Sequence, residues 1–162
     1  MAATIEIRDA GLNEIPQLEA LQRRASLVAP DYREALTAHP EVIQLPATDV
    51  SEQRTRVAIV DGRVAGFSVV LPVHGTACEL DGLFVEPDLT RKGIGRALIG
   101  EVVERAQTLG AHRIDVIANP TAVDFYTEVG FERGDDAMTQ FGPAFWMHLE
   151  CGPASPTPTS AM

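Results

Sequence analysis

Alternation of apolar and polar residues marks the strands of this chain. Residues Thr4 to Arg8 read Thr-Ile-Glu-Ile-Arg, a period of two that places Ile5 and Ile7 on one face of a half-buried strand. Further along, two β-rich runs flank Asp61-Gly62, a dipeptide that tolerates the positive φ angles of a two-residue hairpin turn. The pattern predicts strands at 4–8, 56–60, 63–71, 78–85, 113–118 and 145–149.

Apolar residues spaced three and four apart predict the helices. Ile15, Leu18 and Leu21 begin one such stripe, and Pro16 lies in its first turn, where a missing N–H costs no hydrogen bond. A second stripe ends at Gly110, a residue that suits a C-terminal cap. We expect helices at 13–28, 31–38, 93–109 and 121–129, whereas 39–51 shows no strong period and is expected to be irregular.

Composition and charge limit the classes of partner. The 162 residues fit one domain, which we assign to residues 1–150, and the Pro/Ser/Thr-rich segment 151–162 is expected to be a disordered tail. A net charge of -10 repels phosphate backbones and anionic lipids, so we expect neither nucleic acid nor a membrane as partner. The first residues lack the features of a signal peptide, and we therefore expect a cytoplasmic protein.

Cysteine and histidine spacing gives no metal or disulfide signal. Cys78 and Cys151 lie far apart without a CxxC motif, and the four histidines are dispersed. Metal sites and disulfide frameworks need clustered ligands or paired cysteines. We expect two free thiols and no metal.

The strongest chemical signal is a basic, glycine-bearing loop between a predicted strand and a predicted helix. Gly93 and Gly95 let backbone N–H groups approach a ligand closely, and the helix start adds unpaired donors and about half a positive charge. Arg91, Lys92 and Arg96 supply further positive charge within an acidic chain. The loop therefore suits a phosphate-bearing ligand; an ordinary helix start with a solvated basic face is the alternative interpretation.

Spacing excludes two common phosphate loops. A dinucleotide fingerprint that begins at Gly93 would need glycine at position 98, which is Leu98. A P-loop would need Gly-Lys followed by Ser or Thr, which the chain lacks.

Two motifs in a fixed order carry a family resemblance. Val85-Glu86-Pro87 precedes Gly93-Ile94-Gly95, with Thr90 and then Arg91 before the glycines. Further on, the stretch from Asn119 to Phe131 runs through Asn, Ala, Phe-Tyr and Gly-Phe. Together these motifs resemble the GCN5-related N-acetyltransferase family, whose central motif is Arg/Gln-x-x-Gly-x-Gly/Ala after Val-x-Pro. This chain has Thr90 at the first motif position.

The resemblance implies a fold and a cosubstrate. The implied fold is α/β (α+β), with a mixed central sheet of about six to seven strands flanked by about four helices. The pyrophosphate of acetyl-CoA would lie on the basic loop, and its pantetheine arm would run beside the preceding strand, whose N–H groups would polarise the thioester carbonyl. The implied cofactor-binding residues are Leu83, Phe84, Val85, Arg91, Lys92, Gly93, Ile94, Gly95, Arg96 and Asn119, the last of which would also suit a helix cap.

Three residues are candidates for proton transfer. An alkyl amine is mostly protonated at neutral pH and must lose a proton before it attacks. Glu79 and Asp81 lie two apart on one predicted strand and project to one face; Glu79 matches the glutamate base of the family's histone-acetylating branch. Tyr126 occupies the family's acid position. A solvated acidic strand face and a packed tyrosine are the structural alternatives.

The resemblance therefore implies an acetyl-CoA-dependent N-acetyltransferase. It would transfer acetyl to an amine of a small molecule or peptide by direct attack in a ternary complex; a noncatalytic acyl-CoA-binding or regulatory module is the alternative. Acceptor specificity would come from residues 26–50 and 137–148, in which Tyr32, Phe141 and Trp146 could line a pocket. The acceptor is left open, and a homodimer is possible.

Overall fold

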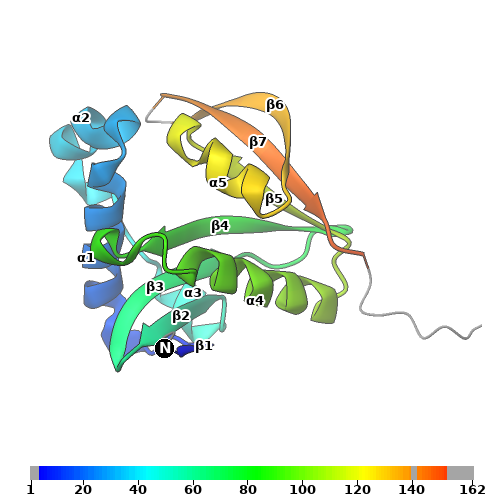
Figure 1. Ribbon diagram of the computed structural model, residues 1–162, viewed down its shortest axis with the longest axis horizontal. Coiled ribbons are helices and arrows are strands. Elements are labelled where there is room, and N and C mark those ends of the chain that lie inside the picture. Colours follow the sequence, from blue (N-terminus) through cyan, green and yellow to red (C-terminus); the bar gives the residue numbers. More distant parts are fainter. Residues whose placement is uncertain (1–3, 140–141, 153–162) are drawn as a thin grey trace, which may run out of the picture.

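The computed structural model describes residues 4–139 and 142–152, without the side chains of residues 31 and 32. Its seven-stranded sheet has the order β1-β2-β3-β4-β5-β7-β6 (Figure 1). The strands are β1 (Ile5–Asp9), β2 (Thr55–Val60), β3 (Arg63–Val70), β4 (Ala77–Val85), β5 (Arg113–Ala118), β6 (Glu132–Thr139) and β7 (Gly142–Glu150). The helices are α1 (Ile15–Val28), α2 (Pro30–Ala38), α3 (Ala47–Ser51), α4 (Ile94–Thr108) and α5 (Val123–Glu128), with 3₁₀ turns at Leu12–Glu14, Pro40–Val42, Pro87–Leu89 and Pro120–Ala122.

Two antiparallel halves of the sheet meet at one short parallel contact. Strands β1 to β4 pair antiparallel with their neighbours, as do β5, β7 and β6. The halves join where Ala77–Leu80 of β4 pairs with Arg113–Val116 of β5. Beyond Leu80, β4 continues to Val85 and pairs only with β3. The sheet is therefore open between β4 and β5.

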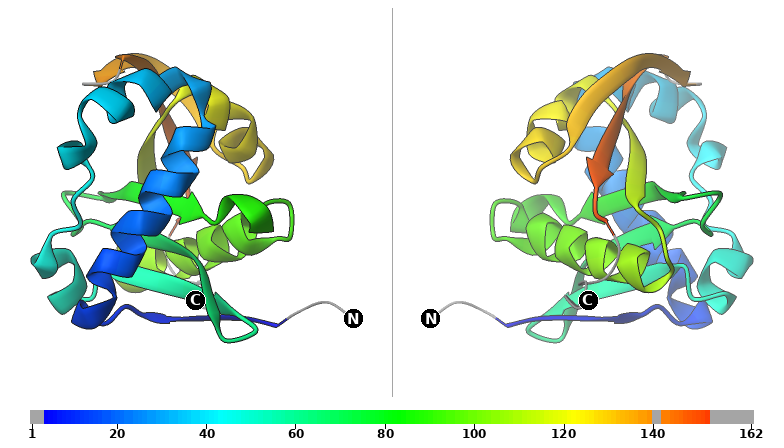
Figure 2. Two further views of the ribbon diagram at one scale, coloured as in Figure 1. Left: turned by 90° about the vertical axis from the view of Figure 1, so that its left-hand side faces the viewer. Right: turned by 90° about the vertical axis from the view of Figure 1, so that its right-hand side faces the viewer.

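Helices cover both faces of the sheet. α1 and α4 lie on opposite faces (Figure 2). On one face Leu18 and Leu21 of α1 pack with Phe67 of β3, and on the other Val102 of α4 packs with Ile114 of β5. Burying apolar helix stripes against the sheet supplies the main stabilisation of such a layered fold. The expected fold class is thus confirmed.

The predicted hairpin turn is confirmed, but two elements differ from the sequence-based expectation. Asp61 and Gly62 have φ angles of 52° and 77°, as the turn requires. The segment 39–51, expected to be irregular, contains α3. β6 was not predicted, because Glu132–Thr139 is an edge strand with many exposed polar residues and lacks apolar alternation. Of the expected disordered tail 151–162, Cys151 and Gly152 are described, and their N–H groups donate to His112 O at 3.0 Å and 3.3 Å; the rest lies outside the described residues.

Candidate functional site

The loop before α4 leaves the start of that helix without a side-chain cap. Gly93 is the N-cap residue, with a φ of 84°, and Ala97 N donates to Gly93 O at 2.9 Å to close the first turn. The N–H groups of Ile94, Gly95 and Arg96 therefore have no acceptor within the helix. A Cβ built on Gly93 would meet no atom within 4 Å, so space adjoins these donors.

Three cations beside this helix start differ from the other basic side chains of the protein. Arg91, Lys92 and Arg96 are exposed, and no ion pair or hydrogen bond holds them among the described residues. Every other arginine contacts a carboxylate, a carbonyl oxygen or an aromatic ring. Unpaired cations and free backbone donors at one place form an anion-binding arrangement.

Gly95 has a packing role that the sequence did not reveal. A Cβ at this position would lie 3.0 Å from the ring of Phe125 in α5. The missing side chain therefore lets Phe125 approach the first turn of α4.

A β-bulge and a free edge distinguish the second half of β4. Leu80 pairs with Val70 and Gly82 with Val69, so that Asp81 is the extra residue of the bulge. Glu86 N donates to Ala65 O at 2.8 Å. Alternation along an antiparallel pair then turns the N–H groups of Leu83 and Val85 away from β3, toward the unpaired edge. These are the groups expected to polarise a carbonyl oxygen.

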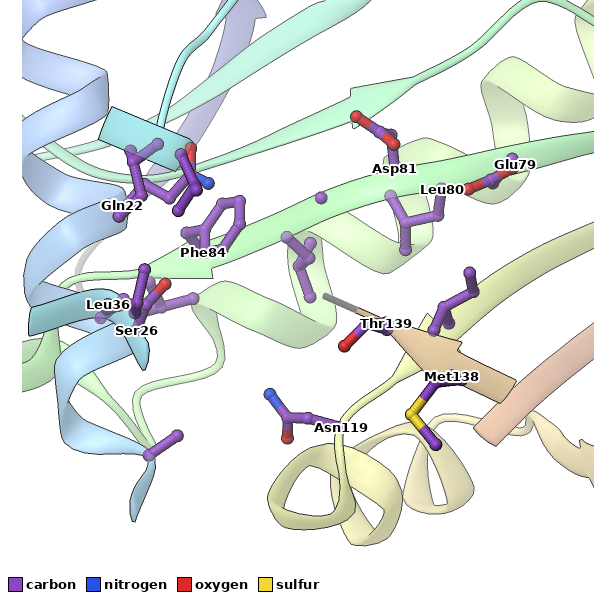
Figure 3. Close-up of a pocket in the computed structure, with 18 residues that line it drawn as sticks. Gln22, Ser26, Leu36, Glu79, Leu80, Asp81, Phe84, Asn119, Met138 and Thr139 are labelled. Atoms are coloured by element: carbon purple, nitrogen blue, oxygen red, sulfur yellow. The ribbon is translucent and has the colours of Figure 1, made fainter. Parts of the chain in front are cut away.

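A cavity of about 650 Å³ lies beside this edge of β4 (Figure 3). Its walls come from α1, α2, the turn Pro40–Val42, the end of β5 and the end of β6. The loop residues 91–96 and Tyr126 do not line it. The structure brings together at this cavity the expected site residues Glu79, Asp81, Leu83, Phe84, Val85 and Asn119.

Both acids of β4 lie in environments that disfavour their charged forms. Desolvation, followed by the charges of Asp81 and Asp115, raises the pKa of Glu79 above its usual value. Desolvation and then the charge of Asp49 raise the pKa of Asp81. No ion pair neutralises Glu79 or Asp81 among the described residues. A carboxylate with a raised pKa accepts a proton more readily than an exposed one.

Tyr126 is buried in the core beneath α5 rather than in the cavity wall. Its ring makes edge-to-face contacts with Phe125 and Phe131, at centroid distances of 5.2 Å and 5.3 Å. Desolvation raises the pKa of its phenol, which keeps the proton on the oxygen at neutral pH. No hydrogen bond holds the hydroxyl among the described residues.

Asn119 combines a helix cap with a place in the cavity wall. Its Oδ1 accepts a hydrogen bond from Ala122 N at 2.8 Å, which was the structural alternative for this residue. The amide Nδ2 has no partner among the described residues and is free for a ligand.

Several functional features were missed by sequence reasoning. Gln22 of α1 lines the cavity, although no motif marks it. Arg24 Nε donates to Glu86 Oε1 at 3.0 Å, joining α1 to the chain that follows β4. Of the three aromatic candidates, Trp146 lines a separate cavity of about 440 Å³ beside β7, while the Tyr32 side chain and Phe141 lie outside the described residues.

In residues 4–139 and 142–152, no group of three or more His, Cys, Asp or Glu is placed to hold a metal ion. No helix in the part of the chain that the structure describes is long and apolar enough to cross a membrane.

Known proteins share the fold of this chain, and a family model matches its sequence. The fold is that of N-acetyltransferases: a GCN5-related N-acetyltransferase from Rhodopseudomonas palustris has a TM-score of 0.73 at 23% identity, covering 93% of this chain and 98% of that chain. The PaiA N-acetyltransferase of Thermoplasma acidophilum, solved with coenzyme A, has a TM-score of 0.70 at 19% identity, with 91% and 99% covered. The sequence model of the acetyltransferase (GNAT) family matches residues 20–131, and the chain belongs to this family.

A curated relative also matches about a third of the chain. It is an uncharacterised N-acetyltransferase of Methanocaldococcus jannaschii, 37% identical over 57 residues, which cover 33% of this chain and 25% of the relative. The match thus spans about a quarter of that protein's length. The resemblance seen in the sequence motifs is confirmed at the level of the family.

Proposed function

We propose that this protein transfers the acetyl group of acetyl-CoA to an amine by direct attack in a ternary complex. The observation that carries the proposal is the charge distribution along the unpaired half of β4. Free cations and an uncapped helix start adjoin its C-terminal end, and uncompensated carboxyl groups line the cavity beside the bulge. A nucleotide diphosphate suits the first place, and an ammonium group suits the second.

In this proposal the backbone and the loop bind the cosubstrate. Arg91, Lys92 and Arg96 bind the pyrophosphate together with the N–H groups at the start of α4. The pantetheine arm lies along the free edge of β4, where Leu83 N and Val85 N can donate to it or to the thioester oxygen. Asn119 donates from Nδ2. Binding therefore uses groups that the fold leaves without partners.

The proton transfers are assigned to Glu79 and Tyr126. Glu79 takes a proton from the ammonium group of the acceptor, directly or through water, and Asp81 is the alternative base at the same cavity. The amine nitrogen forms a bond to the thioester carbonyl carbon, and the carbon–sulfur bond breaks. Tyr126 then donates its proton to the departing thiolate. Its phenol is protonated at neutral pH, so the oxygen holds a proton when the thiolate departs.

Direct attack is favoured over a covalent enzyme intermediate by the state of Cys78. This thiol is buried, and desolvation raises its pKa to about 11. Because the thiolate is the nucleophilic form, Cys78 is inert at neutral pH.

The decisive test measures CoA release from acetyl-CoA by chromatography across amino acids, diamines, arylalkylamines and peptides with free amines. Release that depends on one class of amine supports the proposal. Binding of acetyl-CoA without turnover for any amine would instead favour a noncatalytic acyl-CoA-binding module.

Two expectations from the sequence extend the proposal. A cytoplasmic location is testable by cell fractionation, and a homodimer is testable by sedimentation.

A further inference from the structure

One wall of the cavity is apolar and uncharged. It consists of residues from α1, α2 and the turn after α2, and its buried members include Leu36 and Ile43. Among the side chains that the structure describes, the polar ones on this wall are Gln22 and Ser26, which are neutral. A buried apolar wall recognises methylene or ring carbons rather than charge.

The opposite wall carries negative charge without compensation. Glu79 and Asp81 line it, and neither is ion-paired among the described residues, whereas Asp115, next to Glu79 in the register of β4 and β5, is paired with Arg113. No Lys, Arg or His lines the cavity, and the residues outside the described ranges include none of these three types. A ligand carboxylate would find like charges here and no cation to pair with.

Phe84 adds an aromatic surface between the two walls. Its ring points from β4 toward the side of Gln22 (Figure 3) and rests on the ring of Phe67, with centroids 5.2 Å apart. A Cβ on Gly82 would lie 2.7 Å from this ring, so the glycine permits the position. The apolar part of a ligand can pack on Phe84 while its ammonium group lies near Asp81.

We infer that the acceptor is a small primary amine with an apolar body, a single cationic group and no carboxylate. This inference rests on the proposed acetyl transfer and narrows its substrate class. The cavity has one acidic pole, so a second ammonium group of a diamine would be desolvated against the apolar wall without a partner. An amino acid would bring its carboxylate against Glu79 and Asp81.

The test compares amines in pairs that differ only by an α-carboxylate. Phenethylamine and phenylalanine form the apolar pair, and cadaverine and lysine form the dicationic pair; a free-amine peptide completes the set. We expect kcat/KM for phenethylamine to exceed that for phenylalanine and that for cadaverine by about tenfold or more. Equal or higher values for phenylalanine, cadaverine or the peptide would overturn the inference.

A charge-adding variant sharpens the test. Gln22→Lys supplies the cation that the wall lacks, so it is expected to raise kcat/KM for phenylalanine and lower it for phenethylamine. Gln22→Leu is the matched control without added charge and keeps the preference for phenethylamine. An unchanged preference for phenethylamine in Gln22→Lys would contradict the electrostatic basis of the inferred specificity.

Failure of the inference and failure of the proposed function give different results. Absence of CoA release with every amine, despite bound acetyl-CoA, would count against the proposed function itself. Turnover with the wrong member of a pair counts only against the inference.

Discussion

The two ends of the unpaired half of β4 have opposite electrostatic character. After Val85 the chain passes through a 3₁₀ turn to an exposed loop whose three cations have no partners in the part of the chain that the structure describes. At the bulge, Asp81 and Glu79 line a cavity with apolar walls and no cation. One strand therefore separates a place suited to a polyanion from a place suited to an ammonium group.

The two ends differ in how far binding depends on side chains. The loop at residues 91–96 combines backbone donors with exposed charges, whereas the cavity has Glu79, which is half-buried, and Asp81, which is exposed, and partial desolvation raises the pKa of both. Exposed charges are screened by solvent and salt, but desolvated ones interact strongly. Changes at the cavity and beneath it are therefore expected to affect turnover more than changes in the loop affect binding.

The largest effect is expected from Tyr126→Phe. The variant keeps the ring between Phe125 and Phe131 and removes only the hydroxyl, so the fold is retained. Loss of a general acid is expected to lower kcat by about a hundredfold or more. Steady-state kinetics measure this loss, and calorimetry is expected to give an unchanged Kd for acetyl-CoA. Unchanged kcat would remove Tyr126 from the mechanism.

Glu79→Gln is expected to lower kcat/KM for the amine by about tenfold to a hundredfold at neutral pH. In the native protein the rate rises with pH through the raised pKa of Glu79, because only its carboxylate accepts a proton. The variant loses this limb of the pH profile. Asp81→Asn is the matched control, and a larger loss in that variant would assign the base to Asp81.

Glu79→Gln is expected to lower activity but to raise the stability of the folded protein. Because the pKa of Glu79 is raised on folding, the folded state holds this proton more tightly than the unfolded chain, and stability falls as pH rises through the raised pKa. Glu79→Gln should therefore unfold at a higher temperature than the native protein at pH 7. The difference should vanish below the ordinary carboxyl pKa, as thermal melts across pH would show.

Local patterns predicted the cosubstrate end of β4 better than the acceptor end. The loop and its cations are contiguous in sequence, so spacing alone placed them at the start of α4. The acceptor wall combines Gln22, Leu36 and Ile43 with β4, and only tertiary packing brings these residues together. The polar edge strand β6 has no apolar period to detect, and the pairing of Gly95 with Phe125 depends on the approach of two helices.

Removing the cations of the loop before α4 is expected to weaken the binding of acetyl-CoA. Replacing Arg91, Lys92 and Arg96 together by Ala is expected to raise KM for acetyl-CoA by about tenfold and to leave KM for the amine unchanged. The salt dependence of KM should decrease, because fewer charges are left to screen. Arg8→Ala removes an exposed cation of β1, away from the loop and the cavity, and serves as the control. An equal rise in that variant would show that net charge, rather than the loop, binds the cosubstrate.

The smallest effect is expected from Glu86→Gln. This variant tests whether the contact between α1 and the residue after β4 holds the amine cavity in place relative to the loop at residues 91–96. Glu86 is buried just after β4 and accepts hydrogen bonds from Arg24 of α1, the helix that lines the acceptor cavity. Loss of this charged contact is expected to cost about 1–2 kcal/mol of unfolding free energy and to raise both KM values a few-fold. Denaturant unfolding and kinetics measure these changes.

Asp88→Asn provides the matched control for that contact. Its partner Arg63 bonds it at 3.1 Å on the exposed side of the same turn, where solvent screens the pair. We expect no measurable change in KM for either substrate. Because the hydrogen-bonded partner of Glu86 lies in α1 and that of Asp88 lies in β3, a loss in Glu86→Gln alone means that α1 positions the acceptor relative to β4. Equal losses in both variants would instead mean that the turn 87–89 acts only by holding the loop.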